Sequence, residues 1–433
     1  MAQTLSPARV ALAGPAARPF RRPRLLTPER FVAAILFVCL VLQRFALPVS
    51  DLALSVAAPL GLLLGAWGLA SGVLSIDRRR SACFLGLCAI ALVATAVHAN
   101  IPVAIAPRTS FHSLIYWLAI TGFAVLRLRE PMPEEQFFAV VSRWLTVVAA
   151  AGVLAFVGQF VGLTLFTFRH LVPAKLLIEY QYAVVIPLPG SGFLRANGFF
   201  LVEPSVFSQF MAVGIIVELL YFRRTWRMAL YAAGLLASVS GTGWLVLAAF
   251  LVRSMLTTSS RNVTRALILV AVCVLAVVAA SLILPDATSV LLSRTNELSE
   301  TGSSGYARFV TPFMALGWVL HDAPWSLLTG LGPGASQSML LPFHYDIDTP
   351  VKIVIEYGAF GLATYLGLLL AARRTARQNL LVAPLMVLLM FTGGYQDFPP
   401  ILFPVVLITT VAALRDTTAA SRPAPMARRR VRG

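Results

Sequence analysis

The chain has 433 residues, of which 58% are apolar and only 12% are charged. Soluble domains are about 45–50% apolar and about 25% charged, so this composition excludes a soluble protein and indicates an integral membrane protein. The formal net charge of +17 does not indicate a nucleic-acid partner, because the basic residues lie in short clusters between apolar runs, as in membrane proteins with basic inner loops.

The two ends of the chain are basic and poor in apolar runs. Residues 1–30 carry six arginines and one acid, Glu29, and residues 415–433 are also rich in arginine. We expect both to be basic cytoplasmic tails, the first of them disordered, although an organellar transit peptide has a similar composition. Residues 31–414 then form a single polytopic membrane domain.

An all-α integral membrane fold follows from the apolar runs, since a membrane-spanning helix needs about 20 apolar residues. We place about twelve spans near residues 31–48, 52–76, 81–98, 111–126, 137–163, 205–222, 228–239, 241–252, 264–284, 351–371, 379–395 and 401–414.

The stretch 227–252 decides the topology. It is either one long helix or two short helices that turn at Ser238 to Gly243, where Ser, Gly and Thr favour a loop. Only the hairpin puts every basic cluster on the inner side, as positive-inside bias requires. These clusters are Arg78 to Arg80, Arg127/Arg129, Arg223/Arg224/Arg227, Arg253/Arg261/Arg265 and Arg373/Arg374/Arg377.

Two long loops then fall on the outer side, at 164–204 and 285–350. Loops of this length in a compact domain are usually functional. The second contains Thr311-Pro312 followed by spaced apolar residues, which predicts a short surface helix with Thr311 as its N-cap and Pro312 at its first position.

Polar residues and glycines gather in and after these loops. Arg195 lies in a segment that runs Gly192-Phe-Leu-Arg195-Ala-Asn-Gly198 and reaches Glu203-Pro204-Ser205 at the start of a span. Arg308 follows Ser303-Ser304-Gly305, and further on come Gly330-Leu-Gly332-Pro-Gly334, Phe343-His344-Tyr345 and Glu356-Tyr-Gly358-Ala-Phe-Gly361.

This ordered set resembles the O-antigen ligase/polymerase superfamily, and its Arg…Gly…Glu-Pro-Ser form is more similar to the Wzy-type polysaccharide polymerases. The resemblance implies a GT-C-like glycosyltransferase of the bacterial inner membrane with its active site facing the periplasm. The implied reaction transfers a glycan chain from polyprenyl diphosphate to a sugar hydroxyl of another lipid-linked repeat unit. The implied partners are these donor and acceptor glycolipids, membrane lipids and a chain-length regulator, with no nucleic acid and no cofactor.

Two alternatives stay open. The first is the ligase reaction, in which the glycan is transferred to lipid A core. The second is a secondary transporter or flippase, although transporters place ionisable residues near the bilayer midplane. Here the predicted spans are nearly charge-free, with Arg44 and Arg143 as the main exceptions.

The chemistry assigns roles to the outer residues. Arginine binds phosphate oxygens bidentately and stays charged, so Arg195, Arg308 and Arg294 are candidates to hold the diphosphate, together with the loop N–H groups of Gly332 and Gly334. His344 is the candidate general base, because its unperturbed pKa is near neutrality, and Glu203 is the competing base.

Each role has a structural alternative. Arg294 can pair with Glu297 or Glu300, and Glu203 can simply cap the helix that follows it. A metal site would have to rest on Asp346 and Asp348 or on Asp51, but such acids in a polar loop are usually solvated, and we predict a metal-independent enzyme.

Overall fold

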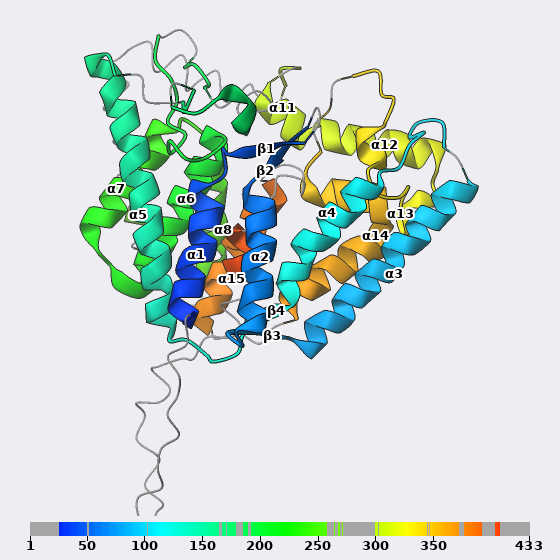
Figure 1. Ribbon diagram of the computed structural model, residues 1–433. Coiled ribbons are helices and arrows are strands. Elements are labelled where there is room, and N and C mark those ends of the chain that lie inside the picture. Colours follow the sequence, from blue (N-terminus) through cyan, green and yellow to red (C-terminus); the bar gives the residue numbers. More distant parts are fainter. Residues whose placement is uncertain are drawn as a thin grey trace, which may run out of the picture.

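The computed structural model describes residues 26–49, 52–101, 103–163, 192–257, 303–343, 347–371, 376–391 and 403–407, with shorter stretches at 167–169, 171–178, 185–188, 264, 267–268, 271, 299–301 and 345. Most of this part of the chain is helical (Figure 1). The helices are α1 (Pro28–Val41), α2 (Ala57–Ala70), α3 (Arg78–Asn100), α4 (Phe111–Gly122), α5 (Glu134–Gly158), α6 (Pro204–Val217), α7 (Thr225–Ala237), α8 (Thr242–Leu256), α11 (Ser304–Phe309), α12 (Thr311–Asp322), α13 (Ser326–Thr329), α14 (Thr349–Leu370) and α15 (Ala376–Phe391). Single turns of 3-10 helix lie at η1 (Phe123–Val125), η2 (Gln159–Val161), η3 (Ala174–Leu176) and η7 (Ala335–Gln337), and a π-helical turn, η5 (Glu218–Phe222), continues α6.

Four helical segments are long and apolar enough to cross a membrane: Arg78–Asn100, Glu134–Val161, Pro204–Phe222 and Thr349–Leu370. Shorter apolar helices cover Ala57–Ala70, Phe111–Val125, Thr242–Leu256 and Gln378–Met390. The mostly helical fold expected from the sequence is therefore confirmed, and these helices could span a membrane, whereas the count of twelve spans stays a prediction. The predicted spans 264–284 and 401–414 lie largely outside the described residues.

Two small two-stranded antiparallel sheets take residues that the sequence assigned to spans. β1 (Ala46–Val49) pairs with β2 (Leu52–Ser55), and β3 (Leu74–Ile76) pairs with β4 (Leu126–Leu128). Pro48 lies in β1, and the Ser50-Asp51 pair separates the two strands. Proline lacks the N–H that a helix needs, so the apolar run after α1 ends as a strand and not as more helix.

The predicted break between residues 238 and 243 is present. α7 ends at Ala237 and α8 begins at Thr242, and Val239 between them has a left-handed φ of 45°. Gly243 allows α8 to approach α6 closely, because a Cβ there would lie 2.5 Å from the carbonyl oxygen of Ser208. The hairpin thus depends on a glycine as well as on its turn residues.

The second long loop contains three described helices, α11 to α13, and not the single surface helix that was expected. Thr311 is not an N-cap, since Val310 occupies that position and Pro312 lies in the first turn. The Thr311 hydroxyl donates backwards to Ala307 O at 2.8 Å. This bond ties α12 to the end of α11, which explains why the hydroxyl is not used to cap α12.

Helix α6 lies at the centre of the bundle. Every residue from Val206 to Val217 is buried, and the helix packs against α5, α7, α8 and α15. Its first residues reach the end of the molecule where Figure 1 places α11, and α3 begins at the opposite end, near β3 and β4. Because α6 runs through the centre of the bundle, Glu203 at its start lies at the same end of the molecule as Arg308.

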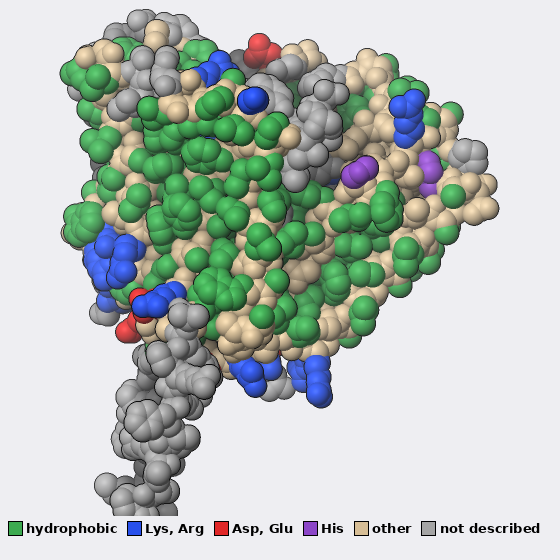
Figure 2. Space-filling view, in the orientation of Figure 1, with side chains coloured by type: hydrophobic (Ala, Val, Ile, Leu, Met, Phe, Trp, Pro, Cys, Tyr) green, Lys and Arg blue, Asp and Glu red, His purple; other side chains and the backbone are tan. Residues whose placement is uncertain are grey.

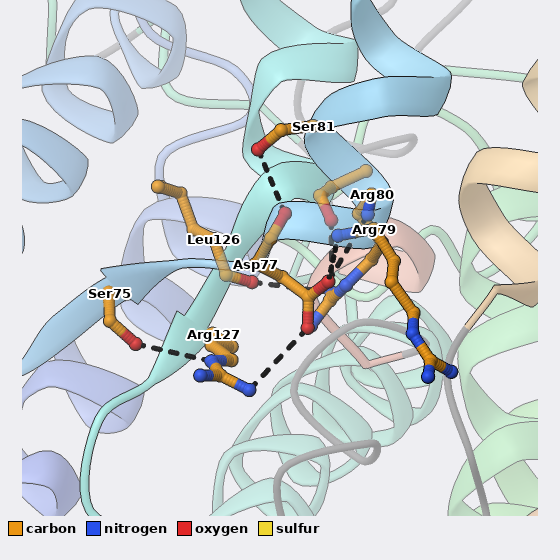
Figure 3. Close-up of polar contacts among 8 residues, drawn as sticks. Ser75, Asp77, Arg79, Arg80, Ser81, Leu126 and Arg127 are labelled. Atoms are coloured by element: carbon orange, nitrogen blue, oxygen red, sulfur yellow. Dashed lines mark hydrogen bonds and ion pairs between the residues drawn. The ribbon is translucent and has the colours of Figure 1, made fainter.

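The end with β3 and β4 holds a closed ionic cluster (Figure 3). The Asp77 carboxylate caps α3 by accepting from the N–H groups of Arg79 and Arg80 at 3.1 Å each. It also lies 3.7 Å from Arg80 Nη2 and 3.6 Å from Arg127 Nη1. Arg80 Nη1 in addition donates to Ala124 O at 2.9 Å, so this end is fixed by charges that satisfy one another.

Candidate functional site

An ion pair joins two segments that are about a hundred residues apart in the sequence. Arg308 Nη2 lies 3.0 Å from Glu203 Oε2, and Ser205 Oγ donates to the same carboxylate oxygen at 2.8 Å. Arg308 Nη2 also lies 3.4 Å from Ser205 Oγ. The side chains of Arg308 and Glu203 are 18% and 27% exposed, so a ligand can reach both.

Local sequence explains where the Glu203 carboxylate points. Glu203 is the N-cap residue of α6, with extended backbone (φ −145°, ψ 151°), and Pro204 starts the helix. An N-cap acid usually accepts from the helix N–H groups, but the Glu203 side chain makes no such bond. Glu203 thus occupies the N-cap position, where its charge favours the helix N-terminus, but its carboxylate contacts Ser205 and Arg308 and not the helix N–H groups.

A row of hydroxyl groups joins the start of α6 to the start of α8. Thr242 Oγ1 donates to Ser205 O at 3.1 Å and lies 3.1 Å from Ser208 Oγ. Ser208 Oγ donates to Ser205 O at 2.8 Å and accepts from the N–H of Gly243 at 3.1 Å. These bonds fix the backbone on which Glu203 and Ser205 are carried. The sequence indicated Arg308 and Glu203 as site residues but not this row of hydroxyl groups. Its Ser-Gly-Thr-Gly segment was the feature of the sequence that could have indicated it.

Arg195 reaches the same region through its backbone. Its N–H donates to Ile186 O at 2.9 Å, and the next residue, Ala196, donates to Ala237 O at 3.0 Å. The turn that follows α7 thus touches the Arg195 segment at one end and Ser205 at the other. The Nε of Arg195 is enclosed and has no hydrogen-bond partner among the described residues. A buried donor of this kind is costly unless a ligand satisfies it.

Strained backbone marks the segments around this site. Three non-glycine residues in the described part of the chain have a positive φ, and two of them are Phe199 (60°) and Val239 (45°). Phe199 lies between Arg195 and Glu203, and Val239 lies in the turn after α7. Such conformations cost about 1–3 kcal/mol each and gather at functional sites, so they support a functional assignment here.

The glycine loop has a different environment from that predicted. The N–H of Gly332 donates to Glu356 O at 2.9 Å, and the N–H of Leu331 donates to Ile355 O at 2.8 Å. These bonds meet α14 just before Gly358, which breaks the helix with φ 70° and ψ −176°. The Gly332 N–H is therefore occupied by the protein, and diphosphate binding by Gly334 stays a prediction.

A buried carboxylate lies at the same break. Glu356 is fully buried, and its Oε1 accepts a hydrogen bond from Ser336 Oγ on the glycine loop. In the sequence, Lys352 lies one turn before Glu356 and is its simplest partner, but nothing there indicates the contact with Ser336. The Glu-x-Gly spacing was visible, but the helix break that brings the loop to Glu356 was not.

Four candidate residues, His344, Arg294, Asp346 and Asp51, lie outside the described residues. Tyr345, next to His344, donates from its hydroxyl to Ser336 O and Met339 O, each at 3.1 Å. Asp348 is the N-cap residue of α14 and is largely buried. Within the described ranges, no three His, Cys, Asp or Glu side chains gather as metal ligands.

Comparisons with protein-family profiles, with curated proteins and with solved structures match nothing to this chain. The functional assignment below therefore rests on the site geometry and on the motif resemblance of the sequence.

Proposed function

We propose that the protein is a membrane glycosyltransferase that polymerises lipid-linked oligosaccharide repeat units at the periplasmic face of the bacterial inner membrane. In this proposal it belongs with the Wzy-type polymerases of the O-antigen ligase/polymerase superfamily. The glycan chain is transferred from polyprenyl diphosphate to a sugar hydroxyl of an acceptor repeat unit, without a metal ion.

The observation that carries the proposal is the partly exposed Arg308–Glu203–Ser205 cluster. α11, which carries Arg308, and the β3–β4 sheet lie at opposite ends of the bundle (Figure 1). If the basic clusters near β3 and β4 face the cytoplasm, as positive-inside bias predicts, the Arg308 cluster faces the periplasm. A guanidinium at the outer surface of the membrane suits a lipid-linked diphosphate.

The contacts suggest how the donor engages the site. The diphosphate competes with Glu203 for Arg308, because both bind the guanidinium through oxygen atoms. Arg195, with its unpartnered Nε, supplies the second cation in the proposal. Two arginines then stabilise the negative charge that grows on the leaving diphosphate as the glycosidic bond breaks.

The chemical step needs one base. The acceptor oxygen attacks the anomeric carbon, the bond from that carbon to the diphosphate oxygen breaks with its electron pair, and the acceptor proton passes to the base. We propose His344 for this role, and Glu203 is the rival once the donor has displaced it from Arg308. The diphosphate leaves on the polyprenyl lipid.

A transporter is the second candidate, and one observation favours it. α14 is broken at Gly358 beside the fully buried Glu356. Discontinuous membrane helices with ionisable residues are typical of secondary-transporter binding sites. The ligase reaction remains the alternative within the glycosyltransferase class, since it uses the same donor chemistry.

Deletion of the gene, followed by sizing of the lipid-linked glycans, tests these functions. A polymerase predicts that single repeat units accumulate and that the wild-type chain restores long glycans while Arg308→Ala does not. Long chains that remain on the polyprenyl lipid would instead identify a ligase. Single units retained on the cytoplasmic side would favour a flippase, and an unchanged glycan profile would contradict all three.

A further inference from the structure

The turn between α6 and α7 places arginines where a membrane span ends. The apolar segment Pro204–Phe222 is long enough to cross a bilayer, and Arg223 and Arg224 follow it directly. Arginines at the end of a span lie at the level of the lipid headgroups. Figure 2 shows Lys and Arg side chains gathered at the lower left of the molecule, over the lower parts of α5 and α7.

The neighbouring carboxylate of Glu218 balances only part of the positive charge of these arginines. Glu218 is fully buried; its Oε1 lies 3.7 Å from Arg227 Nη1, and its Oε2 accepts from the N–H of Arg224 at 3.2 Å. Arg227 also donates to Ser142 Oγ at 2.8 Å, so its charge is committed inside the bundle. The side chains of Arg223 and Arg224 have no carboxylate partner among the described residues.

Aromatic rings order the same segment. The guanidinium of Arg224 lies 4.5 Å from the Phe222 ring centroid, and that of Arg227 lies 5.0 Å from the Trp226 centroid. Trp226 is 58% exposed, as expected for an aromatic residue at a membrane–water interface. The backbone is also fixed, because Arg223 ends the π-helical turn with a φ of 62° and donates to Glu218 O at 2.6 Å.

We propose that Arg223, Arg224 and Trp226 form a binding site for the headgroup of an anionic phospholipid. The two guanidinium groups bind the phosphate oxygens, and Trp226 lies beside the upper part of an acyl chain. Glu218 stabilises the turn through its contacts with Arg224 and Arg227 and does not contact the lipid. This site lies at the opposite end of α6 from Glu203 and does not depend on the glycosyltransferase assignment.

The test uses the purified full-length protein in neutral detergent. Phosphatidylglycerol, phosphatidylcholine and inorganic phosphate are each titrated, with thermal unfolding and native mass spectrometry as readouts. We expect saturable stabilisation and bound adducts with phosphatidylglycerol, and neither with phosphatidylcholine nor with millimolar phosphate. Equal effects of the two lipids, or stabilisation by phosphate alone, would overturn the lipid site.

The double variant Arg223→Gln/Arg224→Gln should weaken phosphatidylglycerol binding roughly 10–30-fold, since each basic residue near a membrane surface contributes about three- to fivefold. Trp226→Ala should weaken it about 2–5-fold and, at an exposed position, should leave folding intact. The matched control is Arg78→Gln/Arg79→Gln, which removes two exposed charges at the β3 end. If that control lowers affinity equally, or if Trp226→Ala has no effect, binding reflects diffuse positive charge and the proposed site is wrong.

Discussion

The two ends of the bundle use the same pairs of side chains in different ways. At the end with β3 and β4, Asp77 is held by Arg80 and Arg127, and nearby Glu218 is fully buried beside Arg227. At the opposite end, the Glu203 carboxylate has only Arg308 and Ser205 as partners among the described residues, next to strained backbone at Phe199 and Val239. A closed ion pair, whose carboxylate has several donors, fixes the elements around it, whereas an open ion pair, whose carboxylate has few donors, can exchange one of its partners for a ligand.

The strongest expected effect is on activity at the open end. Arg308→Ala should lower polymer formation at least 100-fold, because it removes a cation from the leaving-group site. Its effect on stability should be at most about 1 kcal/mol, since a partly exposed ion pair contributes little. Arg308→Lys should rescue poorly, because ammonium cannot reproduce the bidentate fork. Activity at matched membrane abundance measures this; near wild-type activity in Arg308→Ala would remove the residue from the site.

The second prediction separates the two candidate bases. His344→Ala should lower turnover by about 10²–10⁴-fold, the usual contribution of general-base catalysis. Glu203→Gln should retain more turnover and should lower the donor KM, because a neutral amide competes less well with diphosphate for Arg308.

Steady-state kinetics of both variants decides this assignment. If His344→Ala stays near wild type and Glu203→Gln forms no polymer, the base is Glu203. If the donor KM of Glu203→Gln rises, the proposed competition for Arg308 is wrong.

At the closed end, the largest effect should be on folding. Glu218→Ala removes a buried carboxylate that accepts from Ser142 Oγ at 2.5 Å and faces Arg227. Breaking a buried pair typically costs about 3–5 kcal/mol, whereas Glu218→Gln keeps the side-chain size and one acceptor oxygen and should cost less. Unfolding by SDS in mixed micelles measures both, with the exposed Glu135→Ala as a control expected to stay within about 0.5 kcal/mol. A loss of turnover in folded Glu218→Ala would contradict a purely structural role.

The smallest effect should come from Asp77. Burial opposes ionisation of its carboxylate, but the N–H groups and charges of the neighbouring arginines outweigh burial and hold the pKa of Asp77 below its ordinary value. Its charge therefore stabilises the fold fully above the unfolded pKa of about 3.9 and loses this effect as pH falls through the lower folded pKa.

Asp77→Asn keeps an N-cap side chain but removes the charge, so it should destabilise by less than about 1 kcal/mol at pH 7. The difference from wild type should shrink below pH 4, as measured by detergent unfolding at both pH values. A difference that stays constant with pH would show that the cap, and not the charge, stabilises this end.

The sequence by itself determined the class of protein and several local features. Composition alone indicated a helical membrane protein, because 58% apolar residues cannot be buried in a soluble core. Turn chemistry located the break between α7 and α8, and Pro204 marked the start of α6. These features are local, so neighbouring residues are enough to specify them.

Contacts between distant segments were decided only by the tertiary structure. Arg308 and Glu203 were both candidates in the sequence, but no spacing shows that residues 105 positions apart form an ion pair. The same holds for the row from Ser205 to Thr242 and for the bond between Ser336 and Glu356. Each contact depends on how the helices pack against one another. The burial or hydrogen bond gained in the packed bundle outweighs the local conformational preference of either segment.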